Sequence, residues 1–383
     1  MPGVKRTAIS QFIECYDMIP QSTCIAGEYE LVTAYDGNGK YPSVIYVKDH
    51  NSQSLLTTLN LGIYAHVGGI TYSSKTNTVY VSGASGNILS IPLEDIKSAV
   101  EENQTSVEVE LTPMAKTEIN CSFLTCYSDY LFVGAFDKAN DNIFIAYKIN
   151  DDGSFTETSI QLNLPIKSQG IAFVDYNEKT YLICSCSYGR TSCSKLYVYE
   201  TMMDDQENFI LGELIASYTA PNMSEGIYVE GETLRNLYES CARKYQYNNK
   251  TGELLDLEVE RFPLDNIIAY SVSKLIPIPE VTTESVSSHD ILDQGMCGEE
   301  VYYTLYKNGD MVISGNGEMD DYASSQAPYN KYCDKIRTLT IGSGITKITQ
   351  GSFKNVSQLR QVSINDVLDT KLIIEQGVFE DCD

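Results

Sequence analysis

The first 280 residues consist of short runs in which apolar and polar positions alternate. The runs are rich in Val, Ile and Tyr, and the segments between them are rich in Asn, Asp, Gly and Ser. This pattern is typical of short β-strands bounded by turns. One stretch differs. Pro92–Glu102 has Pro near its start and acidic residues in its first turn, which predicts a helix.

A motif recurs five times among these strands: a polar residue, often a Gly, one or two apolar residues, then a turn and a second strand. The last apolar residues of the copies are 45, 54, 47 and 56 residues apart. A period near 50 with about four strands per unit is typical of β-propeller blades. We therefore predict a mainly β protein with a five-bladed β-propeller over residues 1–280. The copies are Pro20–Ile25, His66–Ile70, Asn120–Leu124, Ser168–Ile171 and Ser224–Ile227.

The occurrence of glycine in this motif has a physical explanation. The innermost strands of a propeller crowd around its axis, and a residue without Cβ permits the closest approach of backbones. The fifth unit is stretched, and we expect Asn266–Ser271 to supply its later strand. We expect the opening segment, Thr7–Cys15, to complete that blade and hold the ring shut.

The composition changes after residue 280. Residues 281–294 are rich in Ser, Thr and acidic residues, which predicts a linker. In residues 295–383, two alternating runs flank Asn308-Gly309, a strong hairpin signal. Two related units follow, each with a short strand and a Phe that we expect in a shared core. Phe353 and Phe379 are 26 residues apart, which is within the range of leucine-rich repeats.

This second part resembles the entry cap and first turns of BspA-like leucine-rich repeat proteins of bacterial and some protist surfaces. The resemblance covers about residues 296–383 and rests on the order of Cys297-Gly298, Ile313–Met319 and the repeats. Tyr303 and Tyr329 stand where that family usually has Trp. About two repeats are also fewer than the three or more that usually bury the faces of such an array.

The first part resembles secreted or lipid-anchored bacterial propellers related to the YncE-like and gluconolactonase-like groups. The resemblance rests on His66–Tyr72, Ser168–Ala172 and Ser224–Ile227. Together the two resemblances imply a secreted or cell-surface protein. Residues 1–10 lack the apolar centre of a signal peptide, so this expectation rests on the resemblances alone.

The charge of the chain excludes some partners. It carries 52 acidic and 27 basic residues, a formal charge of −25, which repels nucleic acid and anionic lipid. We therefore expect no nucleic-acid partner. No apolar run approaches the roughly 18 residues that a membrane-spanning helix needs, so we expect no transmembrane segment.

The strongest candidate site is the ring of polar residues that we expect just before each inner strand. In a propeller, these positions converge at one mouth of the central channel. His66 and Glu225 could ligate a divalent metal or act as a proton-transfer pair, with Gln21 and Gln169 as polar clamps. Alternatively, the ring satisfies backbone groups and channel water. Its members are Gln21, His66, Asn120, Gln169 and Glu225.

The sequence is compatible with two alternative functions. The first is a non-enzymatic binding or adhesion protein that recognises a host or matrix protein or a glycan. The second is a propeller enzyme, such as a metal-dependent lactonase, lyase or glycan hydrolase, that acts at the channel mouth. The fold cannot choose between them. No catalytic residue and no firm cofactor is assigned, and the sequence leaves the oligomeric state open.

Overall fold

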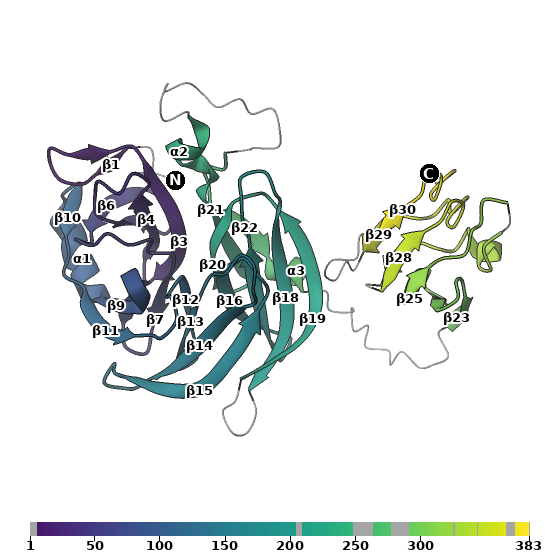
Figure 1. The fold of residues 1–383 in the computed structure, drawn as a ribbon, viewed down its shortest axis with the longest axis horizontal. Helices are drawn as coiled ribbons and strands as arrows, with labels where there is room; N and C mark the ends of the chain where they lie inside the picture. The colour runs from purple at the N-terminus through teal and green to yellow at the C-terminus, as the bar shows by residue number, and fades with distance from the viewer. Residues whose placement is uncertain are drawn as a thin grey trace. The chain divides into compact units, whose positions relative to one another are not determined.

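The computed structural model describes residues 6–203, 209–247, 263–276, 291–324, 326–342, 344–364 and 372–382. The chain divides into two compact units, Met1–Pro277 and Ile278–Asp383. Both consist mainly of β-sheet (Figure 1). Among the described residues, no helix is long and apolar enough to cross a membrane.

The first unit is a five-bladed β-propeller, as the five sequence copies predict (Figure 1). In each blade the first strand in sequence leads an antiparallel meander. The first two blades consist of β3 (Met18–Ala26), β4 (Tyr29–Asp36), β5 (Val44–Asp49) and β6 (Leu55–Asn60), and of β7 (Ile70–Ser73), β8 (Thr78–Ser82), β9 (Asn87–Pro92) and β11 (Thr112–Lys116). The next two consist of β12 (Phe123–Tyr127), β13 (Tyr130–Gly134), β14 (Asn142–Ile149) and β15 (Phe155–Leu164), and of β16 (Ser168–Tyr176), β17 (Lys179–Cys186), β18 (Ser194–Met203) and β19 (Phe209–Ala220).

The connection between β9 and β11 ties the first two blades together. It begins with helix α1 (Leu93–Glu101), which confirms the predicted helix and buries Leu93, Ile96 and Ala99. The chain then forms β10 (Ser106–Glu108), which pairs in parallel with the outer strand β6 of the first blade. It returns to the second blade as β11, so the backbone of one blade extends the sheet of another.

The fifth blade has three strands among the described residues: β20 (Ser224–Glu230), β21 (Thr233–Tyr238) and β22 (Ile268–Ser271). Strand β22 lies within the predicted segment Asn266–Ser271. The prediction that Thr7–Cys15 adds a strand to this blade is wrong. Instead, β1 (Thr7–Ala8) pairs with β2 (Glu14–Cys15), because a tight turn closed by a hydrogen bond from Ile9 N to Ile13 O folds the segment on itself.

Side chains close the ring between the first and fifth blades. Ile9 and Cys15 of the hairpin pack in one buried apolar cluster with Met18 of the first blade and with Leu237 and Cys241 of the fifth-blade segment. The hairpin therefore bridges the two blades by packing and not by strand exchange. We refer to this contact between the first and fifth blades as the seam.

A network of charged side chains connects the same two blades. Lys48 and Glu30 form a buried ion pair in the first blade. Arg235 of β21 lies 3.7 Å from the Glu30 carboxylate and 2.9 Å from that of Glu230 on β20. Glu230 also contacts His50 Nε2 at 3.0 Å. Charges from both blades thus meet across the seam, where removal of one partner would leave another charge buried and unpaired.

The inner strands approach as closely as the motif glycines predict. A Cβ on Gly69 would lie 2.5 Å from Leu124 N of the next blade, and one on Gly170 would lie 3.0 Å from Gly226 Cα. A Cβ on Gly226 would lie 2.2 Å from Ser22 Oγ across the seam. Glycine is therefore required at these places by the space between blades.

The second unit contains two sheets whose later strands are parallel. Strand β23 begins at Ile291, so the predicted linker 281–294 is wrong for residues 291–294, and residues 281–290 lie outside the described chain. The hairpin at Asn308-Gly309 is confirmed by the pairing of β24 with β25. The sheets are β23 (Ile291–Met296), β24 (Val301–Tyr306), β25 (Asp310–Gly315), β27 (Thr338–Ile341) and β29 (Gln361–Ile364), and β26 (Gly317–Glu318), β28 (Ile345–Ile348) and β30 (Ile373–Ile374).

A column of aromatic rings connects the repeated units. Tyr303 packs edge-on against Tyr329 with ring centroids 5.0 Å apart. Tyr329 stacks on Phe353 at 5.6 Å, and Phe353 stacks on Phe379 at 5.7 Å. The two Phe residues therefore contribute to one shared core, as predicted, and the two Tyr residues fill the buried positions at its beginning.

We predict that Gly226→Ala lowers the free energy of unfolding by about 2 kcal/mol, because the new methyl group would overlap Ser22 of the first blade. Chemical denaturation of the full chain measures the loss. Glu213→Ala, at an exposed position of β19, is the control and should change stability by less than about 0.5 kcal/mol. Equal effects of the two variants would show that the seam tolerates a side chain at residue 226.

Candidate binding site

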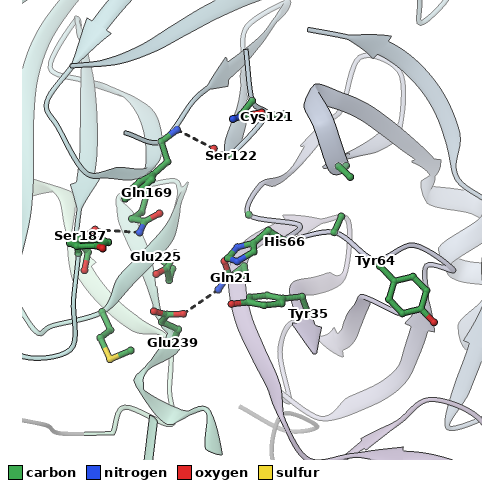
Figure 2. Close-up of a pocket in the computed structure, with 18 of the residues that line it drawn as sticks. Gln21, Tyr35, Tyr64, His66, Cys121, Ser122, Gln169, Ser187, Glu225 and Glu239 are labelled. Atoms are coloured by element: carbon green, nitrogen blue, oxygen red, sulfur yellow. Dashed lines mark hydrogen bonds between the residues drawn. The ribbon is translucent and has the colours of Figure 1, made fainter. Parts of the chain in front are cut away.

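A single cavity of about 710 Å³ collects polar side chains from all five blades. All five residues of the predicted ring line it, so the structure brings together side chains that are far apart in the sequence. Figure 2 shows Gln21, His66, Gln169 and Glu225 around the cavity. Because every blade contributes, the cavity lies where the inner ends of the blades converge. The ring residues are Gln21, His66, Asn120, Gln169 and Glu225.

The ring residues differ in depth. Gln21 and Glu225 are 3% and 6% exposed and form the deep part of the cavity. Gln169 is half-buried, whereas His66 and Asn120 are the most exposed members of the ring, although Tyr35 covers one face of the His66 imidazole. The difference follows from the backbone: the first three lie within β3, β20 and β16, and the last two lie on the connections before β7 and β12.

Irregular pairing aims the three strand residues into the cavity. The register of β3 with β4 shifts between Pro20 and Ser22, which brackets Gln21. Similar shifts bracket Gln169 in β16 and Glu225 in β20. A bulge adds a residue to one strand and turns its side chain away from the regular alternation. The bulges therefore explain how polar side chains of buried strands reach the cavity.

A line of hydrogen bonds crosses the deep part of the cavity (Figure 2). The amide of Gln21 donates to Glu239 Oε2 over 3.4 Å and to the Pro20 carbonyl over 3.0 Å. Its other end, Oε1, lies 3.0 Å from His66 Nδ1. Since an amide oxygen only accepts, His66 Nδ1 must carry the proton of this bond. The imidazole also stacks on Tyr35, with ring centroids 4.0 Å apart.

This arrangement leaves Nε2 of a neutral His66 as an acceptor. Loss of water contact and the positive charge of Lys244 lower the pKa of His66. Both effects favour the neutral imidazole at pH 7. The structure pairs His66 with Gln21 and not with Glu225, the proton-transfer partner expected from the sequence.

Glu225 instead faces a second carboxyl, that of Glu239 (Figure 2). Burial, the charge of Glu239 and a hydrogen bond to it raise the pKa of Glu225 well above its usual value. Burial also raises the pKa of Glu239, although hydrogen bonds from Tyr245 and Gln21 oppose this. The pair therefore holds a proton that Glu225 donates to Glu239.

Sequence reasoning missed Glu239, Lys244 and Tyr245. They lie on η2 (Glu239–Cys241) and just beyond it on α2 (Arg243–Gln246), within the long connection between β21 and β22. Tyr245 donates to Glu239 Oε2 over 3.0 Å. The sequence feature that could have revealed these three residues is the unusual length of the fifth unit. A long connection in a compact domain often carries functional residues.

Aromatic side chains and cations border the same cavity. Tyr64 and Tyr188 are 64% and 49% exposed, so their rings are open to a ligand. The Arg190 guanidinium lies over the Tyr245 ring, 4.7 Å from its centroid. Across the described residues, no group of three or more His, Cys, Asp or Glu side chains is placed to hold a metal ion. The cavity is thus organised around hydrogen bonds and aromatic faces.

We predict that Glu225→Gln raises the free energy of unfolding at pH 8 by on the order of 1 kcal/mol. The raised pKa means that the folded protein holds a proton which the unfolded chain loses above its usual pKa of 4.5. Stability from this group is therefore full below pH 4.5 and falls as the pH rises. The glutamine keeps the donor to Glu239 without a proton to lose.

Denaturation curves between pH 4 and pH 8 measure this effect, with Glu213→Gln as the exposed control. The wild type and the control should lose stability with rising pH more steeply than Glu225→Gln. Parallel curves for all three proteins would contradict the raised pKa.

Comparisons with known proteins show neither a family nor a function for this chain. No protein-family model matches the chain. No curated protein matches it either. A leucine-rich repeat protein from Eubacterium ventriosum is 27% identical over 24% of this chain, with a TM-score of 0.22, and the chain spans about 24% of that protein.

Two propeller structures cover more of the chain. The β-propeller domain of the Trilobed protease from Pyrococcus furiosus is 12% identical, covers 78% of this chain and 82% of its own length, and has a TM-score of 0.30. A candidate 6-phosphogluconolactonase from Bacteroides uniformis is 12% identical, covers 65% and 73%, and has a TM-score of 0.37. At these values the similarities carry no conclusion about activity.

Proposed function

We propose that this protein binds a glycan, and that the cavity of the propeller holds one sugar unit of it. The observation that carries the proposal is the convergence of a polar side chain from each of five blades on one cavity that aromatic rings border. Its volume of about 710 Å³ falls within the range of small-molecule sites. Amide and carboxyl groups can both donate to and accept from sugar hydroxyls.

The chemical character of the lining supports a sugar over an apolar ligand. Gln169 donates to the Ser187 carbonyl over 3.3 Å, which fixes its amide and leaves Oε1 to accept. The protonated Glu225, whose O–H is donated to Glu239, supplies a neutral carbonyl acceptor in the deep part of the cavity. Exposed Tyr64 and Tyr188 offer flat faces with a polar tip, which suit a ligand that has both apolar and hydroxyl-bearing surfaces.

The second unit fits a binding role. Its parallel strands and stacked Phe residues support the BspA-like leucine-rich repeat assignment, which we propose together with a secreted or cell-surface location. On this proposal the partner is a host or matrix protein or glycan, and the two units provide two rigid surfaces for it.

A propeller enzyme is the second candidate, and the carboxyl pair favours it specifically. A protonated Glu225 beside an ionised Glu239 provides the acid and the base that lactone hydrolysis or elimination requires. Glycan hydrolysis fits poorly, because it needs carboxyl groups about 5 Å or more apart, whereas these two share a hydrogen bond.

Binding of the full chain to an oligosaccharide array, followed by calorimetry on captured glycans, tests the proposal. We expect Gln169→Ala to weaken binding about tenfold through loss of hydrogen bonds to hydroxyls. Gln161→Ala, at an exposed position of β15, should leave affinity unchanged. Capture that resists Gln169→Ala would place the ligand elsewhere, and no capture of any glycan would reject the proposal.

Product analysis on the same mixtures separates the two candidates. Unchanged ligand after prolonged incubation favours binding. Turnover that Glu239→Gln abolishes would favour the enzyme.

A further inference from the structure

The cavity has a charge that the rest of the chain does not lead one to expect. The protein as a whole carries −25. Lys244 and Arg190 nevertheless both line the cavity, and in the described part of the chain neither forms an ion pair. The Lys244 ammonium donates to the Gly37 carbonyl over 3.4 Å, and the Arg190 guanidinium stacks on Tyr245. Both cations are thus held in place, and Lys244 lies close enough to Glu239 for its charge to lower the pKa of that carboxyl.

The acidic groups of the cavity offset only part of this charge. Glu225 and Glu239 are adjacent and hold one proton between them, because two neighbouring buried carboxyls resist double ionisation. Together they contribute one negative charge against the two positive charges of Lys244 and Arg190. His66 is neutral, since Lys244 and loss of water lower its pKa. The lining therefore has an excess of one positive charge.

We propose that the ligand carries a carboxylate, as in a hexuronic acid unit of an acidic glycan, and that Lys244 and Arg190 bind it. This inference rests on the proposed function and names its substrate class. A single carboxylate matches the excess charge, and a planar guanidinium matches the geometry of a carboxylate. The stacking of Arg190 on Tyr245 orders the guanidinium before the ligand arrives, which lowers the entropy lost on binding.

Glu225 completes the recognition. It is 6% exposed, lines the cavity beside Glu239, and its pKa is raised well above the usual value. Its one O–H is donated to Glu239, so its other oxygen can accept from a ligand hydroxyl, and as a neutral group it does not repel a carboxylate as an ionised one would. The distant negative charges oppose an anion weakly, because physiological salt screens charges beyond about 8 Å.

Calorimetry with a glucuronic acid oligosaccharide and with its methyl ester tests this proposal, since the ester keeps the sugar and removes the charge. We expect the acid to bind the wild-type chain at least tenfold more tightly than the ester. Lys244→Gln and Arg190→Gln should each remove about tenfold of this preference. Lys195→Gln, an exposed cation on β18 of the fourth blade, is the matched control.

The outcomes distinguish the two proposals. Equal affinity for acid and ester would overturn the carboxylate assignment while glycan binding stands. Tighter binding of glucose 6-phosphate than of the acid would replace the carboxylate by a phosphate. Failure of the acid, the ester and every array glycan to bind would reject the proposed function itself. The comparison of acid with ester uses only the wild-type protein, so it does not depend on the folding of a variant.

Discussion

The contact between the first and fifth blades is the constraint on which the rest of the propeller depends. Among the described residues no strand is exchanged across it, so packing and polar contacts must hold the ring closed. The hairpin Thr7–Cys15 fills an apolar cluster on both sides, and Gly226 lets β20 approach β3 to van der Waals distance. The Tyr228 hydroxyl adds a bond of 3.4 Å to the Ile25 carbonyl. Because the ring is closed by many small contacts and the net stability of a protein is small, the loss of any one of them should lower the free energy of unfolding noticeably.

The candidate site depends on the same contact. Gln21 belongs to the first blade, whereas Glu239 and Tyr245 belong to the fifth, and the bond from Gln21 to Glu239 crosses the seam. A small opening of the ring would separate these groups before it disturbed any single blade. The geometry of the acid pair therefore depends on the closure of the propeller. This dependence explains why polar groups are buried at the seam, where apolar residues could have stabilised the fold at a lower desolvation cost.

The sequence revealed the blades and the ring residues because both follow a local pattern that repeats. Each copy places its polar residue two or four residues before its last apolar residue, near the start of its inner strand. The correct period was therefore enough to predict the convergence of Gln21, His66, Asn120, Gln169 and Glu225. Glu239 and Tyr245 occur in one blade only, so no repeated motif could predict them. The Thr7–Cys15 hairpin and the start of β23 at Ile291 also escaped prediction, because each depends on which partner a short strand selects.

The energetics of the cavity favour a role in recognition over one in folding. Lys48 and Glu30 are buried as an ion pair of opposite charges, as structural charges usually are. The cavity contains a different arrangement: two adjacent buried carboxyls hold one proton between them, and two cations line the same cavity without an ion pair among the described residues. The adjacent carboxyls and the cations without an ion pair each lower the stability of the folded protein. A ligand that donates to Glu225 and neutralises Lys244 and Arg190 would complete the interactions that the protein alone leaves open, and that complementarity is the strongest physical argument for a polar, negatively charged partner.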